Sequence, residues 1–188
     1  MDMIKRRKEA NSSIGYVFLF LTVMLLMIIT MYPMQVAKLM THQHYVDDAL
    51  AASVLGSLVA DDQYYFVTNE TTGTPVIRFR DVDESFDIFS DCMHGAVNET
   101  VDYYYNFSLD SFICYEVEGS TIRVTTYSGN GGIKSVSTGR VGSVRTPTGA
   151  IVRETSAYGK VRFDIKSILD GSFITKTKDI YCTLEIND

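Results

Sequence analysis

Proline, cysteine and histidine are scarce in this sequence, with three of each among 188 residues. So few prolines, together with the absence of any low-complexity tract, argue against a disordered chain. The cysteines form no CxxC pair and show no cysteine–histidine spacing typical of zinc. We therefore expect a folded chain without a metal site.

Catalytic motifs are also missing. The sequence contains no nucleophile elbow, Walker loop, HExxH motif or EF-hand loop. The glycine-rich residues 129–132 lack the strand-to-helix context of a phosphate-binding loop and predict a hairpin turn. We expect a protein that is not an enzyme and needs no cofactor.

Net positive charge is confined to the beginning of the chain. The whole chain carries −6, and residues 1–40 hold five Lys/Arg against two acids, or +3, which leaves −9 for residues 41–188. Nucleic-acid binding requires the opposite sign, so nucleic acid is excluded as a partner.

The sequence does contain a long apolar run. Residues 14–32 carry no charge, and about 20 helical residues match the ~30 Å hydrocarbon core of a bilayer. The basic cluster Lys5, Arg6, Arg7 and Lys8 precedes the run, whereas only Lys38 follows closely. Because basic residues stay in the cytoplasm, we predict a cytoplasmic leader over residues 1–13, a single transmembrane helix over residues 14–40 and an extracellular remainder.

The fate of this segment has three interpretations. A retained anchor is favoured, because the run is longer than a secretory signal and no small-x-small cleavage site follows it. Removal as a signal peptide and prepilin-type processing near Gly15–Tyr16 are the alternatives.

An amphipathic pattern continues beyond the membrane and predicts a stalk helix over residues 41–64. Larger apolar residues recur at helical spacing, namely Leu39, Val46, Leu50, Val54 and Leu58. Ala52, Gly56 and Ala60 lie four apart and would let another backbone approach closely. This small-residue stripe is a candidate assembly interface, and packing against the chain's own domain is the alternative.

The remaining residues, 65–188, predict an α+β head domain. Residues 68–74 read as a turn-rich break, and a second helix is expected from Asp83 to Tyr105, capped by Asp83 or Ser85 and split near Gly95. From residue 112 the apolar period changes to two, which is typical of half-buried strands. Strands are expected over residues 113–117, 121–127, 139–144, 150–158, 160–165 and 179–186, and the alternation also resumes at Ile133 after the 129–132 turn. Short turns between the strands indicate an antiparallel sheet.

The three cysteines, Cys92, Cys114 and Cys182, all lie on the predicted outer side, where two of them could form a disulfide. The sequence does not choose the pair, and three unpaired thiols are the alternative. Cys182 alternates with apolar residues and should face the core, whereas Cys114 shares its strand face with Glu116 and should be more exposed.

Two segments carry a resemblance to a known family. They are residues 45–55, YVDDALAASVL, and residues 144–149 with 154–158, VRTPTG and ETSAY. With the basic leader, apolar helix and small head, the chain resembles TadE-type pseudopilins of tight-adherence (Tad) pilus systems, in their divergent Gram-positive form. Many pilin-like proteins carry a glutamate early in the apolar run, but residues 16–20 contain no acid here.

The resemblance implies a pilin-like fold and a structural subunit of a bacterial pilus or secretion assembly. Its implied partners are the lipid bilayer, other pilin-like subunits and an assembly platform, and it implies no catalytic residue. The alternative function is an anchored extracellular ligand-binding domain, such as a sensor or adhesin.

Overall fold

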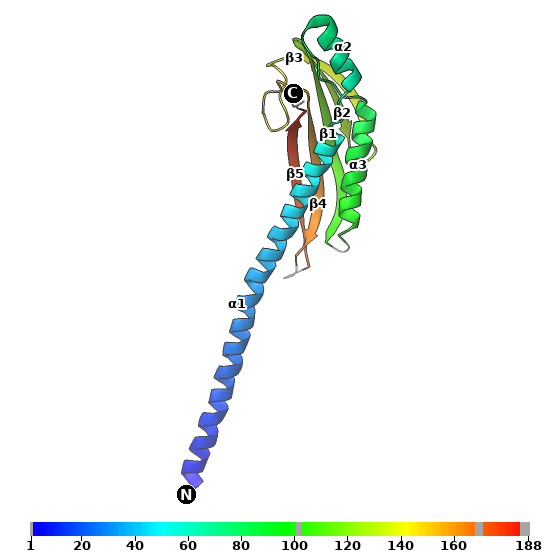
Figure 1. Ribbon diagram of the computed structural model, residues 1–188. Helices are drawn as coiled ribbons and strands as arrows, with labels where there is room; N and C mark the ends of the chain where they lie inside the picture. The colour runs from blue at the N-terminus through cyan, green and yellow to red at the C-terminus, as the bar shows by residue number, and fades with distance from the viewer. Residues whose placement is uncertain (1, 101–102, 168–170, 185–188) are drawn as a thin grey trace. The chain divides into compact units, whose positions relative to one another are not determined.

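The computed structural model describes residues 2–100, 103–167 and 171–184, with residues 2–13 described by their backbone alone. It divides into two compact units, Met1–Gln43 and His44–Asp188. Three helices and a five-stranded antiparallel sheet are present in the described residues, which confirms the α+β class (Figure 1).

Helix α1 (Asp2–Ser57) includes the apolar run. Side chains of residues 14–34 are all exposed in the absence of a membrane, and the helix is long and apolar enough to cross one. The helix continues through Pro33 without a break. An exposed apolar surface of this length is what a bilayer, rather than water, would accommodate.

The prediction that this helix reaches Tyr64 is wrong. It ends at Ser57, where the Val59 N–H donates to the Ser57 carbonyl at 2.9 Å, and helix α2 (Asp62–Thr72) begins separately. The Asp61 side chain caps α2 by accepting from the Tyr64 N–H at 3.1 Å. An N-cap aspartate satisfies a free N–H of the first turn, so the new helix starts where the sequence pattern had suggested continuation.

The predicted turn at residues 68–74 is also wrong for most of its length. Thr68 and Thr72 lie in the last turns of α2, and their hydroxyls donate to carbonyls four residues earlier, at 2.8 and 2.7 Å. The helix ends at Gly73, whose φ of +66° is the left-handed conformation that favours glycine.

Helix α3 (Val82–Asn98) is shorter than predicted and is not split at Gly95. Its cap is Asp81, rather than Asp83 or Ser85: the Asp81 carboxylate accepts from the Asp83 N–H at 2.8 Å. The chain then enters a strand at Tyr104, within the span predicted to be helical.

The sheet has the order β3-β2-β1-β4-β5, and all neighbours are antiparallel. Its strands are β1 (Tyr104–Glu118), β2 (Thr121–Ser128), β3 (Ile133–Arg140), β4 (Ser156–Lys166) and β5 (Phe173–Thr183). The turns after β1 and β2 are where the glycines predicted them. The end of the last predicted strand, residues 185–186, lies outside the described residues.

The strands predicted over residues 139–144 and 150–158 are wrong in extent. β3 ends at Arg140 and β4 starts at Ser156, so residues 141–155 form a loop with one isolated bridge. Gly142 has a φ of +86°, which turns the chain back so that the Val144 side chain lies against Gly139. The strand predicted at residues 160–165 continues β4 without a break.

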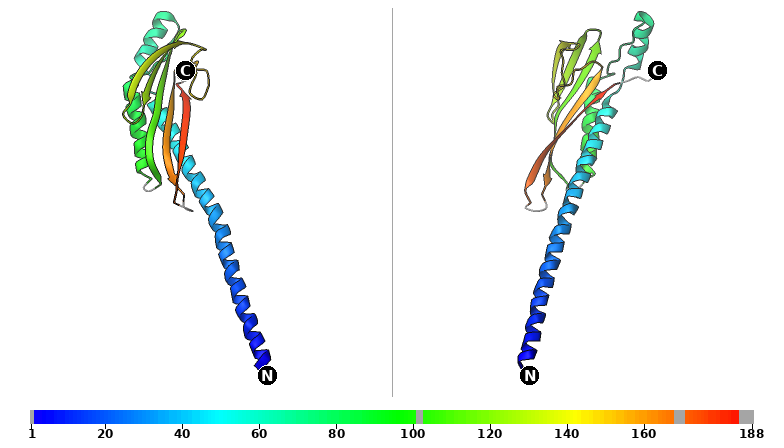
Figure 2. Two further views of the ribbon diagram at one scale, coloured as in Figure 1. Left: turned by 180° about the vertical axis from the view of Figure 1, so that it is seen from behind. Right: turned by 90° about the vertical axis from the view of Figure 1, so that its left-hand side faces the viewer.

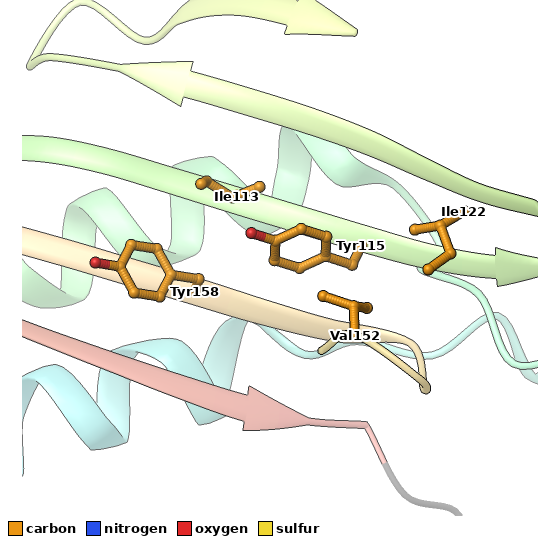
Figure 3. Packing of buried hydrophobic residues seen from close by; sticks show 5 residues of the cluster. All are labelled: Ile113, Tyr115, Ile122, Val152 and Tyr158. Atoms are coloured by element: carbon orange, nitrogen blue, oxygen red, sulfur yellow. The ribbon is translucent and has the colours of Figure 1, made fainter. Parts of the chain in front are cut away.

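The two faces of the sheet bury separate sets of side chains. On one face, Phe89 of α3 stacks on Phe112 of β1 with ring centroids 4.6 Å apart, and residues 44–57 of α1 pack on the same face as α3 (Figure 2). The other face carries a smaller cluster beneath the 141–155 loop, shown in Figure 3: Ile113, Tyr115, Ile122, Val152 and Tyr158.

Candidate functional site

The small-residue stripe divides between two elements. Ala52 and Gly56 lie on α1 and are exposed, and a Cβ built on Gly56 would meet nothing within 4 Å. Ala60 lies beyond the end of α1 and pairs with Phe79 in an isolated bridge. The exposed face of α1 therefore contains Ala52 and Gly56 without Ala60.

The opposite side of the same helix is buried in the His44–Asp188 unit. Val46, Leu50 and Val54 are almost completely inaccessible, as the larger apolar stripe predicted. An ion pair between Asp47 and Lys178 of β5, 2.8 Å long, fixes the helix along the sheet. Because the large residues pack inward, Ala52 and Gly56 remain open on the outer side.

Exposed apolar side chains also occur outside the apolar run, and three of them lie on or near the open side of the helices. Leu55 on α1 is 56 % exposed, and Phe66 and Val67 on α2 are 62 % and 56 % exposed. Helix α2 buries none of its residues. Leu55 neighbours Gly56, so the exposed face of α1 offers apolar area as well as close approach.

The other predicted residues have simpler outcomes. The side chains of Lys5, Arg6, Arg7 and Lys8 lie outside the described side chains. No group of three His, Cys, Asp or Glu that could hold a metal occurs in the described part of the chain.

All three cysteines are free thiols, and the predicted exposures are reversed for two of them. Cys114 is buried and Cys182 is half-buried, because helices cover the face of β1 to which Cys114 points. Burial raises the pKa of the Cys114 thiol. Ala157 of β4 pairs with Cys114 on one side and with Cys182 on the other. The two cysteines are therefore two strand spacings, about 9–10 Å, apart, which is too far for a disulfide between them within one chain.

A polar cavity lies near one end of the sheet. β4 starts at Ser156 opposite Tyr115, so residues 116–118 of β1 have no β4 partner. Thr155 fills part of this gap: its hydroxyl accepts from the Val117 N–H at 3.1 Å and donates to the Ile77 carbonyl at 2.6 Å. The polar cavity, here called the sheet-end cavity, has a volume of about 480 Å³ and lies between the β1–β2 hairpin and the segment from α2 to Arg78. It is lined by Tyr64, Val76, Arg78, Glu116, Val117, Glu118, Thr121 and Arg123.

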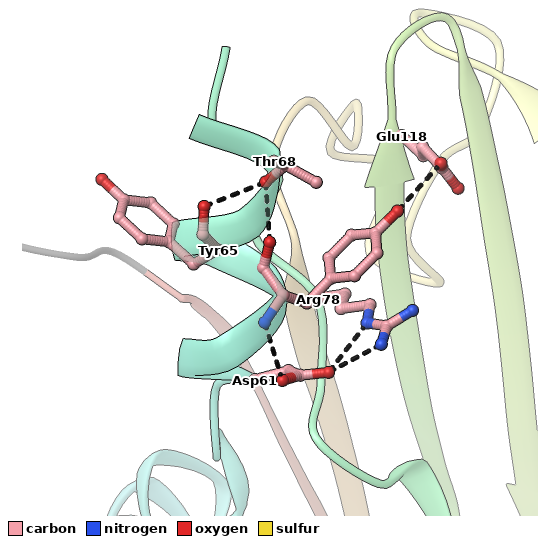
Figure 4. A network of polar contacts seen from close by, with 6 residues as sticks. Asp61, Tyr65, Thr68, Arg78 and Glu118 are labelled. Carbon is pink, nitrogen blue, oxygen red and sulfur yellow. Dashed lines mark hydrogen bonds and ion pairs between the residues drawn. The ribbon is translucent and has the colours of Figure 1, made fainter. Parts of the chain in front are cut away.

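One wall of the sheet-end cavity is a connected network (Figure 4). The Arg78 guanidinium donates twice to Asp61 Oδ2, at 3.0 and 2.7 Å, and stacks 3.6 Å from the centroid of the Tyr64 ring. The Tyr64 hydroxyl donates to Glu118 Oε1 at 3.4 Å. The hydrogen bond from Arg78 lowers the pKa of Asp61, so this pair is ionised at neutral pH.

The opposite wall is less tightly paired. Glu116 and Arg123 are cross-strand partners on β1 and β2. Burial raises the pKa of Glu116, while the Arg123 charge opposes this effect. Among the described residues the Arg123 side chain forms no hydrogen bond and no ion pair within 4.0 Å. Its guanidinium is available to a bound molecule.

No family model, curated protein or solved structure matches this chain.

Proposed function

We propose that the chain is a non-enzymatic, single-pass, membrane-anchored subunit of a bacterial pilus or secretion assembly, similar to the TadE-type pseudopilins. In this proposal residues 14–40 hold the chain in the bilayer, with the basic leader in the cytoplasm and the His44–Asp188 unit outside. Other pilin-like subunits or the assembly platform are its partners.

The observation that carries the proposal is the two-sided character of α1 between His44 and Ser57. One side packs into the folded unit through Val46, Leu50 and Val54. The other side leaves Ala52 and Gly56 open beside an exposed leucine. Small residues on a helix surface let a second backbone approach closely, and Leu55 adds apolar area that such a contact would remove from water.

A second candidate function is an anchored extracellular ligand-binding unit. The sheet-end cavity favours it, because its volume of about 480 Å³ falls within the ~300–1,000 Å³ of small-molecule sites and polar groups converge on it.

Gly56→Leu tests the assembly function. The leucine meets no neighbouring atom, so the folded unit should keep its stability while the close approach of a second subunit is blocked. Cross-linking through an introduced cysteine, Ala52→Cys in a Cys92→Ser background, should form dimers in membranes when Gly56 is retained and lose most of them when Gly56→Leu is added.

Gly95→Leu is the matched control, because Gly95 is also an exposed helical glycine with nothing within 4 Å. It should leave cross-linking unchanged. Equal cross-linking with glycine and leucine at position 56 would remove the basis of the assembly proposal, and equal loss in both variants would show a general effect of the substitution.

A further inference from the structure

The charges around the sheet-end cavity do not balance. Asp61 neutralises Arg78 through two hydrogen bonds to one carboxylate oxygen. The groups left to face the cavity are one guanidinium, Arg123, and two carboxylates, Glu116 and Glu118. A complementary molecule therefore carries one negative and two positive groups.

The arrangement of these three groups follows from the hairpin register. Glu116 lies directly across from Arg123, and Glu118 lies two residues further along β1, next to the turn. Residues two apart on a strand point to the same face, about 7 Å from one another, so both carboxylates address the same space. A ligand must present its carboxylate close to one ammonium group and the second ammonium group further away.

The remaining walls suit an aliphatic chain between those groups. Val76 and Val117 form apolar lining of the cavity. Arg78, stacked on the Tyr64 ring, closes another side and is held in place by Asp61. Arg78 needs little reorganisation on binding, because the network in Figure 4 already holds its guanidinium on Asp61.

We propose that the sheet-end cavity binds a free basic α-amino acid of the lysine type, with the ligand carboxylate on Arg123 and its ammonium groups on Glu116 and Glu118. The α-carboxylate and α-ammonium of an amino acid lie side by side, as Arg123 and Glu116 do across the two strands. The side-chain ammonium then reaches Glu118. This proposal rests on the second candidate function and is independent of subunit assembly.

Isothermal titration calorimetry on the full chain in lipid nanodiscs tests the proposal. The probes are L-lysine, L-lysine amide, which lacks the carboxylate charge, and L-glutamate, which has the wrong net charge. Lysine should bind best, and the amide should bind at least about tenfold more weakly, since it loses the charge-assisted hydrogen bond to Arg123.

Arg123→Gln is the decisive variant, because the Arg123 side chain forms no hydrogen bond and no ion pair within 4.0 Å with a described residue. In this variant lysine and lysine amide should bind equally weakly, since the group that distinguishes them is gone. Arg140→Gln, at an exposed arginine on β3 outside the cavity lining, should bind lysine as the unmodified chain does.

Each other result overturns the proposal. No measurable binding of lysine contradicts it directly, as does preferential binding of glutamate. Lysine binding that is unchanged in Arg123→Gln would place the ligand elsewhere on the chain. That result would contradict the proposed amino-acid site but not a ligand-binding function. Equal weakening of lysine binding by Arg123→Gln and Arg140→Gln would show that binding depends on the overall charge of the chain and not on the cavity.

Discussion

Gly159→Ala is expected to weaken the packing of α1 and α3 on the sheet. Gly159 lies in β4, and an added Cβ would lie 2.6 Å from Val54 Cγ2 and 3.0 Å from Phe89 Cε2. Both neighbours are completely buried, so neither can move into solvent. The methyl group must displace one helix or force a side chain out of its preferred rotamer.

The expected cost follows from this geometry. Overpacking a well-filled core costs about 1–3 kcal/mol. Val54→Ala alone should cost about 2 kcal/mol, because two buried methyl groups are lost and a cavity remains. In the double variant the alanine methyl occupies part of that cavity, so the combined cost should be smaller than the sum by about 0.5–3 kcal/mol, the range for contacting residues.

Urea unfolding of the full chain in detergent, followed by near-ultraviolet circular dichroism of its 12 tyrosines, measures these differences. Gly56→Ala is the control: nothing surrounds that position, so replacing a helical glycine should stabilise the chain by about 0.5–1 kcal/mol. Additive effects of Gly159→Ala and Val54→Ala would refute the contact between α1 and β4, and with it the division of α1 into packed and open sides.

Two further predictions concern thiols and pH. A membrane-impermeant maleimide added to intact cells should modify exposed Cys92 rapidly, Cys182 slowly and Cys114 only after unfolding, because burial raises the pKa of the Cys182 and Cys114 thiols. Mass spectrometry of peptides measures the extent of modification at each cysteine. Protection of Cys92 in intact but not lysed cells would contradict the outward orientation. Hydrogen bonds from Lys134 and Tyr127 lower the pKa of Asp83 below its ordinary 3.8, so its charge stabilises the fold above that pH and the stabilisation is lost as pH falls through the lowered value. Asp83→Asn should therefore cost about 0.2–1 kcal/mol at pH 6, the range of an exposed ion pair, and progressively less as the pH falls below 3.8. A difference independent of pH would contradict this cause.

Local patterns in the sequence predicted the parts of the fold that depend on short-range order. The uncharged residues 14–32 predicted the exposed apolar section of α1, and the alternation around Ile113 and Ile122 predicted two paired strands. Val46, Leu50 and Val54 were expected on one helix face and are buried there. In these segments the period of the apolar residues is itself the physical cause of the structure.

The predicted helix boundary at Tyr64 was wrong because the Asp61 side chain caps a new helix, α2. Asp61 was available as an N-cap signal, but the apolar pattern around Leu58 favoured a longer helix. The threonines from Thr68 to Thr72 suggested a turn, yet their hydroxyls bond to carbonyls within the helix instead. Side-chain bonds to the backbone support either outcome, and a short sequence window does not decide between them.

Tertiary packing accounts for the remaining differences. Cys114 was expected to be exposed because it shares a strand face with Glu116. Helices cover Cys114, whereas Glu116 lies near the end of the sheet. The sheet-end cavity lies between the β1–β2 hairpin and residues 64–78, which are far apart in the sequence. No local pattern encodes the approach of segments so far apart, so the cavity was not predicted.

The number of subunits per particle tests the assembly proposal most directly. The chain, at its natural expression level, is extracted from membranes in polymer-bounded native nanodiscs without cross-linker, and the mass of each particle is measured by mass photometry. Particles containing several copies, or the chain with larger partners, are predicted for the unmodified protein and should shrink to single copies with Gly56→Leu but not with Gly95→Leu. Single copies without partners in the unmodified protein would contradict the proposal that this chain is a subunit of an assembly.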